Sequence, residues 1–176
     1  MSRINICGLN GSGKTTLGAK LAEILNYKHK DIEDYYFNNN DNYKYSSSLT
    51  KAEVTQMLEQ DFEMYDNIIL TSCKGDYGNL SNKYDLVIFI RLDRESRMKR
   101  VKERSYKQFG DRILENGDLF DKENEFFSKV YKRREDDIIQ WYEKLTCNKM
   151  EIDGIKPVDE NVRLILNKLN EQRDWP

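Results

Sequence analysis

The residues best suited to chemistry stand near the N-terminus, in the stretch GLNGSGKTT at positions 8–16. Gly8, Gly13, Lys14 and Thr15 fit the pattern G-x-x-x-x-G-K-[ST], in which the backbone N–H groups of a glycine-rich turn surround phosphate oxygens. In this pattern the lysine reaches the β and γ phosphates of a nucleotide, and the hydroxyl of Thr15 is offered to Mg²⁺. The residues that we predict to bind phosphate are Asn10, Gly11, Ser12, Gly13, Lys14, Thr15 and Thr16.

A second group of candidate residues is acidic and lies in the stretch KDIEDYYF at positions 30–37. If a strand of a parallel sheet ends here, its carboxyl end lines the ligand crevice. We expect Asp31 or Asp34 to act as the base or as the acid that orders a metal, with Asp31 joining Thr15 at Mg²⁺. We further expect Glu33, Asp34 and Tyr35 to contact the substrate. The alternative is a solvated acidic turn without a function.

Cations gather later in the chain. Between positions 91 and 112 there are nine Lys or Arg residues and four acids. Arg97, Arg100 and Arg104 are spaced by three and four positions, which places them along one face of a helix. Phosphoryl transfer needs such cations around the transferred group. Arg134 falls on the apolar stripe of the next predicted helix, so it needs a partner, either a structural carboxylate or a bound phosphate.

The elements that must position these residues alternate between strand and helix. Unbroken apolar runs predict strands covered on both faces, as in a parallel sheet, and therefore a three-layer α/β domain spanning residues 1–176. Thr50 and Glu53 form a capping-box pattern, and we expect Asp93 to cap a helix rather than to bind Mg²⁺. The predicted strands are 3–7, 27–32, 67–72, 85–92 and 149–152, and the predicted helices are 15–25, 50–66, 95–105, 121–145 and one from 157. Residues 36–48 and 108–118 are predicted connections.

Composition and missing motifs exclude several other classes of protein. Lys and Arg number 29 against 31 Asp and Glu, a net charge of -2, which gives no bias toward nucleic acid or membrane partners. No apolar run is long enough for a spanning helix, so we expect a cytoplasmic protein. Three cysteines and one histidine do not suit a disulfide framework or a His/Cys metal site. The N-K-x-D at positions 82–85 precedes a strand and no D-x-x-G exists, which argues against a GTP switch.

With the loop at position 8, the basic stretch and the closing segment MEIDGIKPVDENVRLIL, the chain resembles the small P-loop kinases, such as adenylate, cytidylate and shikimate kinases. This resemblance implies a five-stranded parallel sheet in the order 2-3-1-4-5. It also implies a helical lid at about 104–121 that closes over ATP, and an acceptor-binding insert at about 35–66. By position, Arg104 and Arg112 would be lid cations that contact ATP, and Arg134 would be the arginine of the helix after the lid.

The resemblance implies an ATP- and Mg²⁺-dependent transfer of the γ-phosphate to a small molecule, but the acceptor side departs from the nucleotide kinases. Positions 31–90 contain no arginine, so Lys51 and Lys74 would have to bind an acceptor phosphate. An acidic acceptor side suits a hydroxyl, because a carboxylate can accept its proton. We therefore favour a nucleoside or a similar hydroxyl acceptor over a nucleoside monophosphate. A third hypothesis is a nucleotide-binding module that regulates a partner. The oligomeric state is left open.

Overall fold

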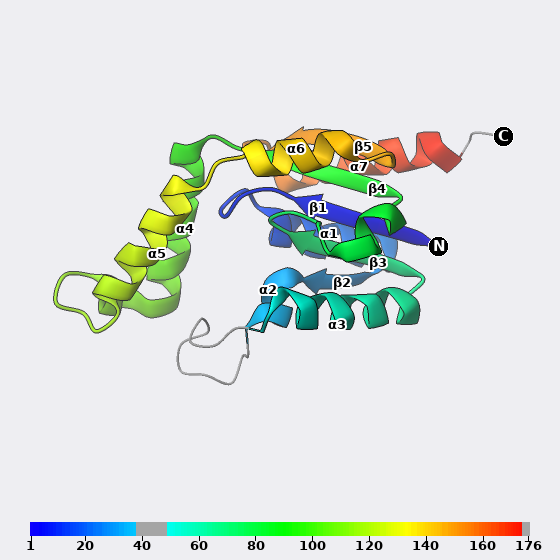
Figure 1. Cartoon of the computed structure of the whole chain (residues 1–176). Coiled ribbons are helices and arrows are strands. Elements are labelled where there is room, and N and C mark those ends of the chain that lie inside the picture. The colour runs from blue at the N-terminus through cyan, green and yellow to red at the C-terminus, as the bar shows by residue number, and fades with distance from the viewer. Residues whose placement is uncertain (38–48, 174–176) are drawn as a thin grey trace.

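A five-stranded parallel sheet forms the centre of the fold, with its strands in the order β2-β3-β1-β4-β5 (Figure 1). This order confirms the predicted sheet. The computed structural model describes residues 1–37 and 49–173. Because all strands are parallel, their carboxyl ends meet at one edge, where the functional groups collect. The strands are β1 Ser2–Cys7, β2 Lys28–Asp31, β3 Asn67–Ser72, β4 Leu86–Arg91 and β5 Asn148–Asp153.

Helices cover both faces of this sheet and give the predicted three layers. Helices α1 Lys14–Leu25 and α7 Val158–Arg173 pack on one face, against a buried cluster that includes Ile6 and Ile88. The other face is covered by α3 Lys51–Met64 and α6 Asp136–Lys144, against a cluster that includes Leu70 and Phe89. Alternate residues of the central strands are therefore buried on opposite faces, which explains why their apolar runs are continuous.

The predicted helix caps are present. The side chain of Thr50 accepts a hydrogen bond from the backbone of Glu53, whose carboxylate accepts from the Thr50 backbone at 2.8 Å, so α3 begins with a complete capping box. Asp93 Oδ1 accepts from the Ser96 N–H at 2.8 Å and caps α4, Arg94–Phe109. Its carboxylate is thus used in the cap, as the sequence predicted.

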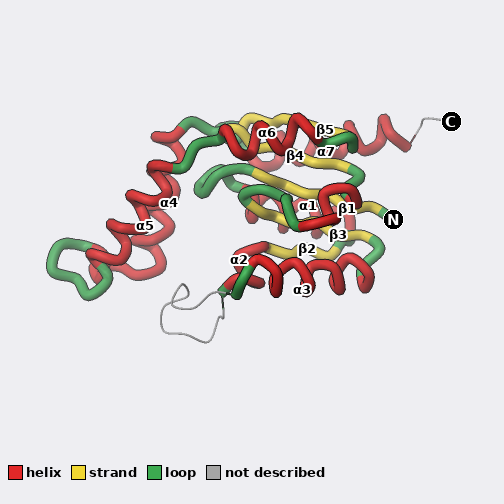
Figure 2. Tube along the Cα trace, viewed as in Figure 1, coloured by secondary structure: helices red, strands yellow, loops and turns green. Residues whose placement is uncertain are grey.

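A helical hairpin projects from one side of the sheet and does not belong to the layers that cover its faces (Figures 1 and 2). It consists of α4, the short 3₁₀ helix η2 Gly110–Ile113 and α5 Phe120–Lys132, and we call it the helical hairpin, residues 94–132. Met98 and Val101 of α4 pack against Val130 of α5. The predicted lid at about 104–121 lies in the outer half of this hairpin.

The predicted helix 121–145 is wrong in one respect, because it is two helices. The break lies at residues 133–135, where Arg133 has extended backbone angles. Charge explains the position: α5 ends with Lys129 and Lys132, whereas α6 begins with Asp136 and Asp137. Cations stabilise the C-terminus of a helix and anions stabilise the N-terminus, so the local sequence favours an end followed by a start.

Two further short helices were not predicted, and one predicted segment lies mostly outside the described residues. A short helix, α2 Ile32–Tyr36, follows β2 directly, and a 3₁₀ helix, η1 Gly78–Lys83, follows β3. Most of the predicted connection at 36–48 and part of the predicted acceptor insert fall outside the described residues. Among the helices of residues 1–37 and 49–173, none has the length and apolarity needed to cross a membrane.

Candidate functional site

The phosphate-binding loop joins β1 to α1, and its backbone requires glycine at positions that include Gly11 and Gly13. Gly11 and Gly13 have φ angles of 83° and 100°, in the left-handed region that favours glycine. A Cβ atom on Gly11 would lie 2.4 Å from the carbonyl oxygen of Arg97, so the loop packs directly on the first turn of α4. Gly13 caps α1 without a side-chain hydrogen bond, which leaves the first N–H groups of the helix available to an anion.

We expect Gly11→Ala to lower the unfolding temperature of the ligand-free protein by several degrees. The reason is that it adds a steric clash to backbone strain of about 1–3 kcal/mol. Gly13→Ala is the matched control, since it carries the same backbone requirement but its nearest neighbour is the Arg100 guanidinium at 3.8 Å. Thermal unfolding followed by circular dichroism compares the two. Equal losses would show that the contact with Arg97 contributes nothing.

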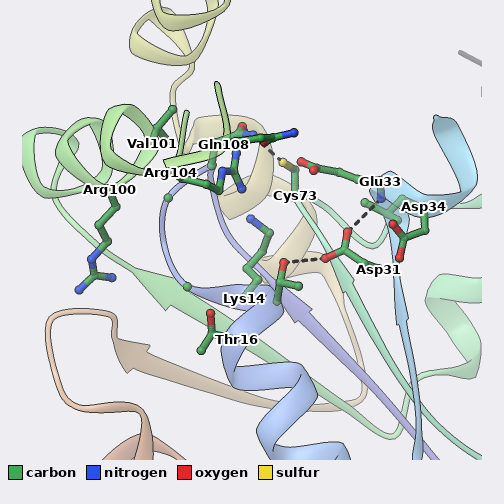
Figure 3. Close-up of a pocket in the computed structure, with 15 residues that line it drawn as sticks. Lys14, Thr16, Asp31, Glu33, Asp34, Cys73, Arg100, Val101, Arg104 and Gln108 are labelled. Atoms are coloured by element: carbon green, nitrogen blue, oxygen red, sulfur yellow. Dashed lines mark hydrogen bonds between the residues drawn. The ribbon is translucent and has the colours of Figure 1, made fainter. Parts of the chain in front are cut away.

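A cavity of about 520 Å³ opens above this loop (Figure 3). The acids that follow β2 form one side of it, and the polar residues of α4 form the other. Lys14 extends into the same region, and its Nζ donates to the carbonyl of Leu9 at 3.1 Å. We call this space the phosphate cavity, and its lining includes Asn10, Gly11, Gly13, Lys14, Thr15, Thr16, Asp31, Glu33, Asp34, Cys73, Arg100, Arg104 and Gln108.

Asp31 accepts three hydrogen bonds at the edge of the cavity. Its Oδ2 accepts from the Thr15 hydroxyl at 2.6 Å and from the Thr71 hydroxyl at 2.9 Å, while its Oδ1 accepts from the Glu33 N–H at 3.0 Å. The last bond caps α2. The Thr71 hydroxyl also lies 3.2 Å from Nε2 of His29. Burial lowers the pKa of His29, although Asp31 and Asp34 oppose this shift.

Thr15 and Asp31 offer the hard oxygen ligands that Mg²⁺ prefers, side by side at the phosphate cavity. Mg²⁺ in phosphoryl-transfer sites is held by one or two protein oxygens together with phosphates and waters, so this small donor set fits the ion. Within the part of the chain that the structure describes, no cluster of three His, Cys, Asp or Glu side chains could form a complete protein cage for a metal.

A second cavity, of about 890 Å³, adjoins the first. Four aromatic side chains line it, two from the segment after β2, one from the segment after β3 and one from α5: Tyr36, Phe37, Tyr77 and Phe126. The lining shared by the two cavities consists of Asn10, Ile32, Glu33 and Cys73. We call the second space the acceptor cavity. Glu33 is the one carboxylate among the residues that line both, and in Figure 3 it extends toward Cys73.

Arg133, which the sequence analysis did not select, reaches the junction between the cavities. Its Nη1 donates to Asn10 Oδ1 at 2.5 Å and lies 3.9 Å from Cys73 Sγ. Arg134 was predicted to face the core, and this is wrong. Its side chain lines the acceptor cavity, but it is 76% exposed and pairs with Asp136 at 2.6 Å. The helix breaks at this point, so the apolar periodicity of one long helix does not apply to it.

The three arginines predicted to share one face of α4 have different environments. Arg97 is buried, and its Nε donates to the carbonyl of Leu92 at 3.0 Å. Arg100 donates to the carbonyl of Gly154 at 3.0 Å, which links α4 to the loop after β5. Arg104 lines the phosphate cavity, where a lid cation was expected. Burial lowers the pKa of Arg97, with Glu135 opposing the shift.

Two predicted cofactor contacts lie in other surroundings. Arg112 forms an exposed ion pair with Asp118, 2.6 Å from Nη2 to Oδ2, at the outer end of the helical hairpin, and it lines neither cavity. The guanidinium of Arg112 is therefore engaged by Asp118 in this structure and does not face the phosphate cavity. Ser12 is a buried residue of the loop itself, and its Oγ has no hydrogen-bond partner among the described residues.

The predicted substrate residues lie in three different places. Asp34 lines the phosphate cavity but not the acceptor cavity. Glu33 and Lys74 line the acceptor cavity, and Lys74 pairs with Asp76 at 3.2 Å. Tyr35 and Lys51 line neither of the two cavities. Tyr35 is buried between α2 and α3, where its hydroxyl donates to Asp61, and burial raises its pKa. Lys51 stands at the start of α3, 3.8 Å from the Asp76 carboxylate.

Comparisons with known proteins agree with this geometry. A protein-family profile described as "AAA domain" matches residues 4–125. Over 176 residues the chain is 26% identical to the uncharacterized protein YqaC of Bacillus subtilis (strain 168), an alignment that covers 95% of this chain and 97% of YqaC.

Solved kinase structures share the fold. A shikimate kinase from Bacteroides thetaiotaomicron has a TM-score of 0.62 at 18% identity, with 96% of this chain and 98% of that one covered. A deoxyadenosine kinase from M. mycoides has a TM-score of 0.56 at 18% identity, with 96% and 99% covered. A gluconokinase from Sinorhizobium meliloti 1021 has a TM-score of 0.60 at 15% identity, with 97% and 93% covered. The predicted similarity to small P-loop kinases is therefore confirmed in the fold.

Proposed function

The chain belongs to the AAA domain family, and we propose that it is an ATP- and Mg²⁺-dependent phosphotransferase that moves the γ-phosphate of ATP to a hydroxyl of a small-molecule acceptor. One observation carries this proposal: the phosphate cavity and the acceptor cavity adjoin, and a carboxylate, Glu33, lines both. A kinase needs a donor and an acceptor on either side of one reacting phosphorus, and a base at the boundary.

The donor side is formed by the phosphate-binding loop and α4. The N-terminus of α1 and the Lys14 ammonium would hold the phosphates, and Arg104 would approach them from the helical hairpin. Thr15 and Asp31 would hold Mg²⁺, which supplies positive charge to the phosphate oxygens when it is bound. Arg133, at the junction of the cavities, would stabilise charge on the transferred group.

The carboxylates can be assigned different roles from their surroundings. Asp31 accepts three hydrogen bonds, which commits it to orienting Thr15 and capping α2. Asp34 lines the phosphate cavity but not the acceptor cavity. Glu33 would accept the proton of the attacking hydroxyl, whose oxygen forms the new bond to the γ-phosphorus as the bond to the leaving ADP oxygen breaks. This replaces the sequence-based choice of Asp31 or Asp34 as base.

The lining of the acceptor cavity favours a planar hydroxyl compound such as a nucleoside. Aromatic side chains bind flat rings by stacking, and four of them line this space. The alternative, a nucleoside monophosphate, needs cations for a second phosphate. Four cations line the acceptor cavity: Lys74 is paired with Asp76 and Arg134 with Asp136, which leaves Lys132 and, at the junction, Arg133.

We expect Phe126→Ala to raise the KM for the acceptor by about tenfold, because truncating a stacking ring typically costs about 1–3 kcal/mol. The KM for ATP should change by less than twofold, since Phe126 lines the acceptor cavity and not the phosphate cavity. Steady-state kinetics with each substrate varied in turn provides the test. Phe127→Ala, a change at the neighbouring position on α5 that lines neither cavity, is the control. A rise in both KM values would place Phe126 outside acceptor recognition.

The activity itself is tested with purified protein, ATP, Mg²⁺ and a panel of nucleosides, nucleoside monophosphates, sugars and aminoglycosides, scored by ADP release. We expect at least one hydroxyl compound to raise turnover well above background hydrolysis, and Lys14→Ala to abolish the gain. Stimulation by monophosphates alone would select the alternative acceptor. If no compound raises turnover while ATP still binds, the proposal of a phosphotransferase is wrong, and a nucleotide-binding regulatory module is supported.

A further inference from the structure

A series of side-chain hydrogen bonds runs from the single histidine to the phosphate-binding loop. Nε2 of His29 lies 3.2 Å from the Thr71 hydroxyl, which donates to Asp31 Oδ2 at 2.9 Å. The same carboxylate oxygen accepts from the Thr15 hydroxyl at 2.6 Å. The four residues come from β2, β3 and α1, so the series ties the edge of the sheet to the first turn of the nucleotide-binding helix.

The direction of each bond follows from the number of protons available. A threonine hydroxyl has one proton to donate and two lone pairs. The Asp31 carboxylate at 2.9 Å is a stronger acceptor than the Lys30 carbonyl at 3.4 Å, so the Thr71 proton goes to Asp31. The Thr71 oxygen is then an acceptor for the N–H at Nε2 of His29. The imidazole therefore fixes the rotation of the hydroxyl, and the hydroxyl fixes the carboxylate.

The packing around this series leaves little freedom to rearrange. Thr71 is fully buried in β3, opposite Asp31 in the register of the sheet. On the other side, α1 approaches so closely that a Cβ on Gly18 would lie 2.4 Å from Thr71 Cγ2 and 2.9 Å from His29 Nε2. Gly18 is one turn beyond Thr15 on the same helix. The close approach of α1 thus holds the Thr15 hydroxyl beside the carboxylate.

Thr71 lies at the end of β3, the strand end that carries a metal-binding acid in motor ATPases. The third strand of related motor ATPases ends in an acid that holds Mg²⁺, and here the corresponding strand ends in Thr71 and Ser72. In this chain the acid beside that position is Asp31, which belongs to the neighbouring strand. The Thr71 hydroxyl donates a hydrogen bond to Asp31 from the end of β3, the position at which a motor ATPase carries its metal-binding acid.

We propose that Thr71 and His29 are positioning residues, which hold the Asp31 carboxylate so that Asp31 and Thr15 bind nucleotide-associated Mg²⁺. This rests on the proposed function only in its use of a Mg²⁺–nucleotide complex, and it needs no acceptor. Residues that orient a metal ligand by hydrogen bonding contribute to metal affinity without touching the ion. The affinity for the nucleotide alone should then be largely independent of Thr71.

The test is calorimetric titration of ADP into the protein with and without Mg²⁺. We expect Thr71→Val to reduce the Mg²⁺-dependent gain in ADP affinity by about tenfold, while the metal-free affinity stays within about twofold. Thr71→Ser keeps the hydroxyl and should restore most of the gain. His29→Leu should reduce the gain by a smaller factor, and His29→Gln, which keeps an N–H donor, should restore it.

Ser72→Ala is the matched control, because it removes a buried hydroxyl from the same strand whose partner is Asn5 rather than Asp31. It should leave the Mg²⁺-dependent gain unchanged. A full gain in Thr71→Val would overturn the proposal, as would equal losses of ADP affinity with and without Mg²⁺, which indicate a structural role. If no acceptor raises turnover but the Mg²⁺-dependent gain in ADP affinity depends on Thr71, the proposed phosphotransferase activity is rejected and the positioning role of Thr71 is kept. A wild-type protein without any Mg²⁺-dependent gain would overturn both.

Discussion

Glu33→Gln is expected to lower kcat by about 10²–10⁴, the range that a general base contributes, while the affinity for Mg²⁺–ATP stays nearly unchanged. The side chain keeps its length and loses only the ability to accept a proton. Glu33 lines both cavities, so it is the acid placed to contact an attacking hydroxyl beside the phosphate-binding loop. The measurement is steady-state turnover with the best acceptor, together with calorimetric binding of Mg²⁺–ADP.

Asp34→Asn is the matched control for this effect. Asp34 is the next residue of α2 and carries the same type of group, but it lines the phosphate cavity without reaching the acceptor cavity. We expect its substitution to change kcat by less than about fivefold, well below the effect of removing a base. A large loss in Asp34→Asn with near-normal turnover in Glu33→Gln would reverse the two assignments.

The second large effect is expected at Arg133. Arg133→Met should lower kcat by about 10²–10³, comparable with the removal of one preorganised donor from other active sites. Methionine keeps much of the aliphatic volume and removes the charge, which lies at the junction of the two cavities and donates to Asn10 of the phosphate-binding loop. Turnover and ADP affinity should be measured together, so that a loss in chemistry is separated from a loss in binding.

Arg134→Met offers a comparison at the neighbouring position. Its side chain lines the acceptor cavity but is 76% exposed and paired with Asp136, so its loss should change kcat by less than about threefold, as expected for an exposed ion pair. Similar losses in the two variants would mean that the break between α5 and α6 does not select one arginine for the site. An effect confined to Arg134→Met would restore the sequence-based choice.

The sheet and the phosphate-binding loop could be predicted because the information for each is contiguous. The motif at positions 8–16 specifies both its conformation and its ligand, and unbroken apolar strands specify a sheet with two covered faces. The sheet order came from the family resemblance rather than from any pattern in the strands. Local signals also identified the caps at Thr50 and Asp93.

The acceptor side could not be predicted in the same way, since it depends on helix boundaries of one or two residues. After the break that follows Lys132, Arg133 reaches Asn10 at the junction of the cavities, whereas Arg134 is 76% exposed at the acceptor cavity. Hydrophobic periodicity alone does not mark this break. The charge reversal from Lys132 to Asp136 was the signal that could have found it. Likewise, the side chains of Glu33 and Asp34 point about 100° apart because both residues lie in the helix α2. A helix of five residues is too short to show a periodic pattern in the sequence.

Asp31 links two halves of the site that are usually discussed separately. One of its oxygens begins the short helix that carries Glu33, and the other receives the hydroxyl of Thr15. The hydrogen bonds of this single carboxylate therefore set the positions of both the proposed base, Glu33, and the proposed metal ligand, Thr15. Walls of the acceptor cavity that come from α5, such as Phe126, are built on a different element. Acceptor preference could therefore diverge among relatives through those walls, while the spacing between base and phosphate stays fixed by one side chain.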